Sequence, residues 1–303
     1  MSIRPVAATT LAAPMIEGAG VRLHRAFGFH DPKRFDPFLL FDDFRGDDPS
    51  DYQGGFPWHP HRGIETITYV LAGEVEHSDS LGNTGRLGAG DVQWMTAGSG
   101  ILHKEMPSGN AAGQMHGFQI WANLPRDLKM TAPRYQDMKS AEIPLIQEDD
   151  GTEVKVITGS FWGRRGPVDG VAADPLYLDV WVPPLKRKRL PIDTRRKAFA
   201  YVFEGEGRFA DAAHPQGVLL EKEVGGEEVN IRDLSGNRTL VHFGAGDEVA
   251  VEAGPMGVRF LLIAGAPIQE PVAWHGPIVM NTAEELRTAM AELKNGTFIK
   301  PAH

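Results

Sequence analysis

The stretch Gly54-Gly55-Phe56-Pro57-Trp58-His59-Pro60-His61-Arg62-Gly63-Ile64-Glu65-Thr66 decides how the chain is interpreted. It contains two histidines spaced i, i+2, and on an extended strand such side chains point to the same face. Pro60 between them has no backbone donor, which predicts a barrel rim or a bulge rather than a central strand. His59 and His61 are therefore candidates for one half of a metal site.

A second pair with the same spacing, His103 and Glu105, follows further along the chain among glycines. The intervening sequence is long enough for several strands, so the two pairs can meet inside a barrel. Neutral imidazole suits Zn, Cu, Fe and Ni, and a carboxylate adds hard-ligand character. On an octahedral metal the four side chains leave two positions open, whereas on tetrahedral zinc they close the shell and the site is structural.

Glu65 shares the alternation of His59 and His61 and is a candidate to face inward, either as a partner that supports the metal ligands or as a proton acceptor. The alternative for Glu65 is an exposed charge on a strand. Large apolar side chains near the two pairs are candidates to line a cavity over the metal, although core packing is the favoured interpretation for most of them: Phe56, Trp58, Trp94, Met95, Met106 and Phe118.

The composition is that of a water-soluble protein with room for a large core. The 303 residues suggest two domains, and the net charge of -9 argues against a general nucleic-acid or acidic-membrane binder. No apolar run is long enough to span a membrane, and residues 1–14 lack the apolar segment of a signal peptide. With no cysteine, disulfides and thiolate metal sites are excluded. We expect a cytoplasmic monomer.

Short β-rich runs separated by glycine and proline predict an all-β fold, a barrel or a sandwich. A segment rich in Pro, Lys and Arg at residues 125–144 suggests the boundary between one domain at 1–135 and another at 136–303. The second half contains eight predicted strands: Val154–Ser160, Leu176–Val182, Ala198–Phe203, Val218–Leu220, Val229–Ile231, Thr239–Phe243, Glu248–Val251 and Val258–Ile263.

One helix is predicted at about 282–295, ending the second domain. Thr282 and Glu285 fit a capping box, and Gly296 stands where a glycine follows a helix. Three apolar residues form a single stripe along it: Leu286, Met290 and Leu293.

Two fragments recur in the same order, which predicts a duplicated barrel. Tyr69–Gly73 resembles Tyr201–Gly205, and Gly88–Asp91 recurs as Gly244–Asp247. Counting from these anchors places Pro191, Asp193, Arg259 and Leu261 where the first half has His59, His61, His103 and Glu105. Three of these four cannot bind a metal, so the second barrel is expected to lack the site.

Residues 55–66 and 91–107 resemble the signature of the pirins, members of the cupin superfamily. The resemblance extends to residues 36–46, 116–124 and 275–282 and so covers nearly the whole chain. It implies two tandem cupin barrels with one metal, usually iron, in the first. The ligands carried over are His59, His61, His103 and Glu105. General cupins take their carboxylate ligand from a position that here is Glu65, so the resemblance leaves Glu65 as a pocket residue.

Some pirins are quercetin 2,3-dioxygenases, which open a flavonol with O₂. The resemblance therefore implies a small aromatic substrate, an Fe(II) cofactor (with Zn, Mn, Ni, Cu or Co as alternatives), and Glu105 or Glu65 as the carboxylate that takes the substrate's proton. Other pirins are regulators that bind a transcription factor or a metabolic enzyme. A metal-binding regulator with a protein partner is thus the alternative function, and a zinc-stapled structural barrel is a third.

Overall fold

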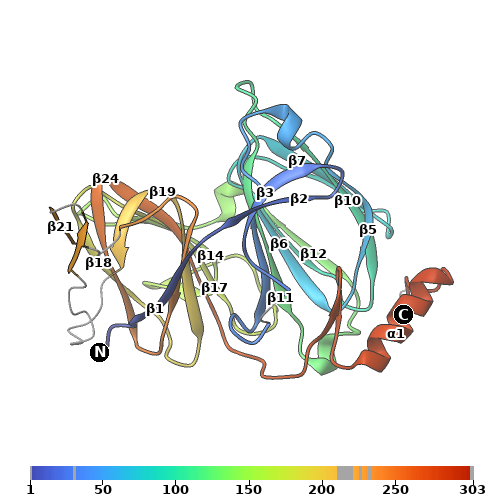
Figure 1. Cartoon of the computed structure of the whole chain (residues 1–303). Coiled ribbons are helices and arrows are strands. Elements are labelled where there is room, and N and C mark those ends of the chain that lie inside the picture. Colours follow the sequence, from blue (N-terminus) through green and yellow to red (C-terminus); the bar gives the residue numbers. More distant parts are fainter. Residues whose placement is uncertain (1, 30–31, 210–220, 225–226, 231–233, 301–303) are drawn as a thin grey trace. The chain divides into compact units, whose positions relative to one another are not determined.

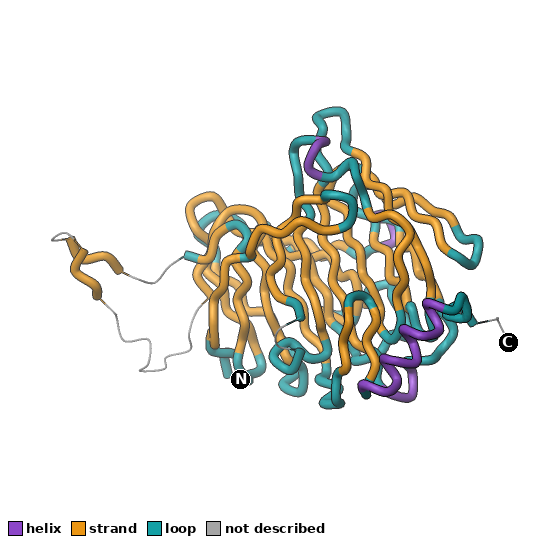
Figure 2. Tube along the Cα trace, turned by 45° about the vertical axis from the view of Figure 1, so that its right-hand side comes forward, coloured by secondary structure: helices purple, strands orange, loops and turns teal. Residues whose placement is uncertain are grey.

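The computed structural model describes residues 2–29, 32–209, 221–224, 227–230 and 234–300. Nearly all of its regular structure is β, as Figure 2 shows, and the described residues contain one α-helix, α1 (Ala283–Lys294). Contacts divide the chain into two compact units. The first unit comprises residues 12–143, 167–174 and 266–303, and the second unit comprises residues 1–11, 144–166 and 175–265.

The first unit is built on two antiparallel sheets (Figure 1). A seven-stranded sheet has the order β12-β9-β6-β11-β4-β3-β2, and a four-stranded sheet has the order β5-β10-β7-β8. The strands of this unit are β2 Ala13–Glu17, β3 Val21–Phe27, β4 Phe38–Asp43, β5 Phe56–His61, β6 Ile64–Ala72, β7 Glu74–Asp79, β8 Thr84–Leu87, β9 Val92–Thr96, β10 Ile101–Ser108, β11 His116–Asn123, β12 Arg134–Met138, β25 Ala273–His275 and β26 Ile278–Met280. Three 3₁₀ turns belong to it: Pro49–Asp51, Arg126–Leu128 and Ser140–Glu142.

The second unit contains a nine-stranded sheet whose main path is β1-β23-β19-β24-β17-β14-β13, with β18 beside β24 and β22 beside β19. Its strands are β1 Val6–Leu11, β13 Leu145–Gln147, β14 Glu153–Thr158, β15 Ser160–Phe161, β16 Arg164–Arg165, β17 Leu176–Val182, β18 Arg187–Pro191, β19 Lys197–Phe209, β20 Glu221–Val224, β21 Glu227–Asn230, β22 Ser235–Gly236, β23 Thr239–Phe243 and β24 Glu248–Gly265. Of the strands predicted in this half, Val218–Leu220 and the last residue of Val229–Ile231 lie outside the described residues.

The grouping of contacts differs from the predicted division at the two ends of the chain. β1 pairs with β23 and so belongs to the second unit. α1 packs on β25 and β26 and so belongs to the first. Each end has a physical reason for its position: β1 completes the hydrogen bonding of a sheet edge, and α1 buries an apolar stripe. The domain bounds themselves stay a prediction.

α1 has the features predicted for it. The Thr282 hydroxyl accepts from the Glu285 backbone N–H at 3.1 Å, and the Glu285 carboxylate accepts from the Thr282 N–H at 2.9 Å, which completes the capping box. Leu286 and Leu293 pack against a buried cluster that includes Phe298. No helix in the described part of the chain is long and apolar enough to cross a membrane.

The interior of the second unit is filled by apolar side chains. Leu190 on β18 and Val249, Val251 and Ala253 on the first half of β24 all belong to this core. β18 pairs with this half of β24 as β5 pairs with β10. The strand segment that corresponds to the one carrying His103 therefore carries small apolar residues and contributes to a packed core.

This topology corrects the correspondence between the two halves that was obtained by counting from the two repeated fragments. Residues 88–91 precede β9, whereas residues 244–247 follow β23 and precede β24, so the two fragments occupy different turns. Arg259 and Leu261 lie in the second half of β24, which pairs with β17 as β11 pairs with β4. They are not the counterparts of His103 and Glu105. Short glycine turns recur between many strands, so matching them does not fix the register.

Candidate metal centre

Two neighbouring strands of the four-stranded sheet, β5 and β10, carry the predicted ligands (Figure 1). In their antiparallel register His103 stands opposite His59, and Ile101 stands opposite His61. The register then shifts, so that Glu105 stands opposite Phe56. β5 is an edge strand. An edge position tolerates Pro60, as its missing donor predicted.

The three predicted histidines meet at one point. One ring nitrogen from each of His59, His61 and His103 lies within 4.8 Å of the others, an arrangement that could hold a metal ion. The ring centroids are 4.4 Å apart for His59 and His103, and 4.9 Å apart for each pair that includes His61. The two i, i+2 spacings and one cross-strand pair suffice to bring the three rings together.

The donor atoms of these rings suit a cation. The His59 Nδ1 lies 2.8 Å from the Pro57 carbonyl oxygen, which fixes Nδ1 as the donor and leaves Nε2 with a lone pair. The buried His61 Nδ1 and both ring nitrogens of His103 have no hydrogen-bond partner within the described chain. Buried polar atoms are almost always paired, so unpaired nitrogens within a group of three converging imidazoles fit a divalent metal.

Burial keeps two of these rings neutral. It lowers the pKa of His61 well below the ordinary value, helped by the neighbouring His103 and His59. Burial likewise lowers the pKa of His103 to about 4, although the Glu105 carboxylate opposes the shift. Neutral imidazole is the form that binds metals, so His61 and His103 need no deprotonation step at neutral pH.

Glu105 lies beside the histidines but outside the group whose donor atoms converge. Its Oε2 is 4.0 Å from the His103 Nε2. Thr68 Oγ1 and Gln119 Nε2 lie 3.3–3.4 Å from its oxygens, which makes them long hydrogen-bond donors. The carboxylate is thus buried, weakly held and next to the candidate metal position. Its role as fourth ligand or as proton acceptor stays a prediction.

The structure does not bring Glu65 to this group. Its carboxylate accepts from the Thr96 hydroxyl at 2.8 Å. Thr68, on the same strand and of the opposite parity, reaches Glu105, so Glu65 points to the other face of β6. Alternation holds only within one strand, and Gly63, with a φ of 75°, separates β5 from β6. Neither interpretation of Glu65 holds: its carboxylate does not face the histidines, and at 2% exposure it is not an exposed charge on a strand.

Glu65 instead makes a testable contribution to stability. It is 2% exposed, its Oε2 has no partner within the described chain, and burial raises its pKa to about 6 from 4.5. A raised carboxyl pKa means that the native state loses stability as the pH rises from 4.5 to 6. We expect the free energy of unfolding of Glu65→Gln to exceed that of the wild type by about 1–2 kcal/mol at pH 7.5, because glutamine does not ionise. Urea unfolding at several pH values checks this, and a difference that does not shrink toward pH 4.5 would contradict it.

A cavity of about 230 Å³ opens onto the histidines. His59, His61 and Glu105 line one side, and aromatic side chains line another. Sequence reasoning named only Phe56 among its other walls and missed Arg25, Phe29, Asp42, Gln119 and Trp121. The i, i+2 spacing of Gln119 and Trp121 could have indicated that both side chains face the same side of a strand. Of the other apolar candidates, Trp94, Met95 and Phe118 are buried in the core, and Trp58 is 52% exposed.

The Arg25 guanidinium forms part of the cavity wall and is rigidly held. Its Nε and Nη2 each donate to the Asp42 carboxylate at 2.8 Å, and Nη1 lies 3.0 Å from Glu17. Burial raises the pKa of Asp42, while the paired Arg25 opposes that shift. A two-bond arginine–carboxylate pair is a rigid group, so this wall keeps its shape.

The turn after His61 is fixed by two buried basic side chains, Arg62 and Lys129. Arg62 donates to the Ser99 and Phe298 carbonyl oxygens at 2.7 and 2.8 Å. The Lys129 ammonium donates to the Gly63 carbonyl oxygen at 2.9 Å. Both side chains are 2% exposed. The C-terminal segment thereby supports the strand that carries two of the histidines.

Two family models match the chain: Pirin over residues 20–122, and the Pirin C-terminal cupin domain over residues 177–299. With the strands described above, they define a bicupin, a protein of two cupin domains, with a candidate metal centre in the first unit. The crystal structure of a quercetin 2,3-dioxygenase from Acinetobacter baumannii has the same architecture. Its TM-score is 0.83 at 28% identity, over 98% of this chain and 99% of that one.

Curated relatives make the identification specific. A Pirin-like protein of Caulobacter vibrioides is 44% identical over 299 residues, covering 98% of this chain and all of that protein. Human Pirin is 40% identical over 296 residues, covering 97% of this chain and 93% of its own length. The chain belongs to the pirin family, as residues 55–66 and 91–107 indicated.

Proposed function

We propose that the protein is a metal-dependent dioxygenase that opens flavonols of the quercetin type. The observation that carries the proposal is the histidine group itself: three imidazoles converge beside an aromatic-lined cavity, and two of them, His61 and His103, have buried ring nitrogens without a hydrogen-bond partner in the described chain. Its likeness to a quercetin 2,3-dioxygenase over nearly the whole chain supports the choice of substrate. The expected metal is Fe(II), and Zn, Mn, Ni, Cu and Co are alternatives.

In this proposal His59, His61 and His103 hold the metal, and Glu105 acts beside them. A bound divalent metal supplies Lewis acidity and, if redox-active, the electron transfer that O₂ chemistry requires. The Glu105 carboxylate accepts the proton of the flavonol 3-hydroxyl group, and its loose contacts leave it an oxygen for this purpose. Phe56 and Trp121 contact the flat rings of the substrate and exclude water.

The test is O₂ uptake with quercetin by protein loaded anaerobically with Fe(II), with metal content measured by elemental analysis. We expect His61→Ala to lose metal and turnover together. Glu105→Gln is expected to lower kcat by about 10²-fold or more, the usual loss for a missing general base. Retained metal in Glu105→Gln would assign it as the base alone, whereas lost metal would make it a ligand as well.

Glu65→Gln is the matched control, because it makes the same chemical change to a buried glutamate. Glu65 lies on β6 and points away from the face that reaches Glu105. We expect its turnover to stay within about twofold of the wild type, since Glu65 touches neither the cavity nor the histidines. Stoichiometric iron with no flavonol-dependent O₂ uptake would overturn the enzymatic proposal. Stoichiometric zinc held by four protein ligands would favour the structural alternative.

A further inference from the structure

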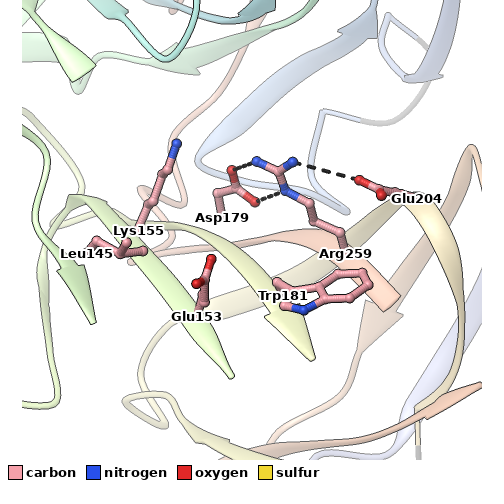
Figure 3. Close-up of a pocket in the computed structure, with 7 residues that line it drawn as sticks. All are labelled: Leu145, Glu153, Lys155, Asp179, Trp181, Glu204 and Arg259. Atoms are coloured by element: carbon pink, nitrogen blue, oxygen red, sulfur yellow. Dashed lines mark hydrogen bonds and ion pairs between the residues drawn. The ribbon is translucent and has the colours of Figure 1, made fainter. Parts of the chain in front are cut away.

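The second unit has a pocket of its own, unrelated to the histidines, on one face of its sheet (Figure 3). Its volume is about 320 Å³. It lies on neighbouring strands, because Lys155 on β14 stands opposite Asp179 on β17, and Trp181 on β17 stands opposite Arg259 on β24. Its walls are formed by Leu145, Glu153, Lys155, Asp179, Trp181, Glu204 and Arg259. This volume is at the lower end of small-molecule sites.

One side of the pocket is a rigid ion pair between Arg259 and Asp179. The Arg259 Nε and Nη2 donate to the Asp179 carboxylate at 3.0 and 2.7 Å, and Asp179 is 3% exposed. The guanidinium also lies 5.1 Å from the Phe203 ring centre. The guanidinium also lies 3.7 Å from the Glu204 carboxylate, so these three groups together carry a net negative charge. The two-bond pair within them holds its geometry. The Arg259–Asp179 pair therefore forms a fixed wall of the pocket, and other side chains are available to bind a ligand.

Two charges of opposite sign on β14 lack a matching charge. The Lys155 ammonium has no hydrogen-bond or ion-pair partner in the part of the chain that the structure describes. Glu153 accepts a hydrogen bond only from the neutral Gln147 amide, at 2.9 Å. Figure 3 shows both side chains among the residues that line the pocket. The wall thus presents one cation and one anion that do not reach each other.

The spacing of these charges is set by the strand. Residues 153 and 155 are two positions apart, so their side chains share a face and their Cα atoms are separated by about 6.5 Å. A carboxylate bound to the lysine and an ammonium bound to the glutamate, each through a hydrogen bond of about 2.8 Å, can bridge such a gap when both belong to one small group. The charged end of an α-amino acid has this form.

The Trp181 indole offers a surface for an apolar side chain. It is half-buried, and its edge rests on Gly257, where a Cβ atom would lie 2.4 Å from the ring. This close approach fixes the ring in place. A fixed indole next to a charge pair suits a ligand that has both an aromatic group and a zwitterionic end.

We propose that this pocket binds a zwitterionic α-amino acid with an aromatic or large apolar side chain. The ligand carboxylate pairs with Lys155, the ligand ammonium pairs with Glu153, and the side chain lies on Trp181. The site is separate from the histidine group, since all of its lining residues belong to the second unit. It does not depend on the dioxygenase proposal.

Isothermal titration of the full chain with L-phenylalanine tests the site. Two analogues each lack one charge: 3-phenylpropionate and 2-phenylethylamine. We expect the amino acid to bind at least about 10-fold more tightly than either analogue, because only it satisfies both charges. Absence of saturable binding, or equal binding by either analogue, would overturn the proposal.

Variants locate the binding. Lys155→Met and Glu153→Gln are each expected to weaken phenylalanine binding at least about 10-fold, and the exposed Lys186→Met serves as a charge-matched control with unchanged affinity. Thermal melts confirm that each variant is folded. Unaltered binding by Lys155→Met would place the ligand elsewhere and reject the site.

Discussion

Arg62→Met is expected to lower the free energy of unfolding by about 3 kcal/mol, the scale of breaking a buried ion pair. The Arg62 guanidinium is 2% exposed, and all three of its nitrogens bond within the first unit. Its Nη1 donates to the Glu292 carboxylate at 2.7 Å, and its Cζ lies 4.1 Å from the Phe298 ring centre. Methionine fills most of the volume but leaves two buried carbonyl oxygens without a donor.

Equilibrium unfolding in urea measures this loss, and Arg62→Lys is the matched control. Lysine keeps the charge but cannot form the planar fork that reaches Ser99, Glu292 and Phe298 together, so we expect it to recover only part of the stability. A loss below about 1 kcal/mol in Arg62→Met, with an unchanged m value, would show that solvent or relaxation replaces these bonds.

We expect Arg62→Met also to change the metal affinity of the candidate metal centre. Arg62 directly follows His61, and its bonds tie the end of β5 to the residues after α1. Groups that orient metal ligands commonly change metal affinity about 10–100-fold when removed. We therefore expect weaker metal binding by the folded Arg62→Met protein in a chelator competition. Unchanged affinity would limit Arg62 to a role in stability.

The histidine group was predictable because it depends on short-range rules. Side chains two apart on a strand share a face, and this alone paired His59 with His61. The convergence of His103 needed only that two strands become neighbours, which β5 and β10 do. The helix at 283–294 was predictable for a similar reason, since its capping box and its apolar stripe are both local patterns.

Features that depend on distant parts of the chain were not predictable in this way. The side-chain alternation could not be carried from His61 to Glu65, because the chain passes at Gly63 from β5 in one sheet to β6 in another. The pairing of β1 with β23 joins residues more than two hundred positions apart, and no local signal marks it. The cavity walls at Arg25 and Asp42 likewise come from strands whose order in the sheet had to be known first.

Lys129 shows what such distant contacts can do to an ordinary residue. Its ammonium is buried beneath the turn at Gly63 and donates to three oxygens: Gly63 O at 2.9 Å, Asn123 Oδ1 at 2.7 Å and Val279 O at 3.1 Å. Burial lowers its pKa to about 7 from 10.5, while Glu270 and Glu285 oppose the shift. No sequence pattern around residue 129 indicates a buried lysine, because two of its acceptors come from other parts of the chain.

This lowered pKa predicts the direction of a pH effect. Between pH 7 and 10.5 the unfolded chain holds a proton on Lys129 that the native state has lost, so native stability rises with pH across this range. Lys129→Met removes this linkage. We expect the difference in unfolding free energy between the wild type and Lys129→Met to change in favour of the wild type by about 3–4 kcal/mol from pH 7 to pH 10.

Comparing the two proteins at each pH cancels the titration of the other groups that they share, and the exposed Lys294→Met controls for the loss of one positive charge. The three oxygen acceptors compete with burial, because they favour the charged form of the amine. If the difference in unfolding free energy stays constant between pH 7 and pH 10, the three acceptors outweigh the effect of burial, and Lys129 remains a cation in the folded state. A rising difference would mean that the turn beside His61 is held by a neutral amine above neutral pH.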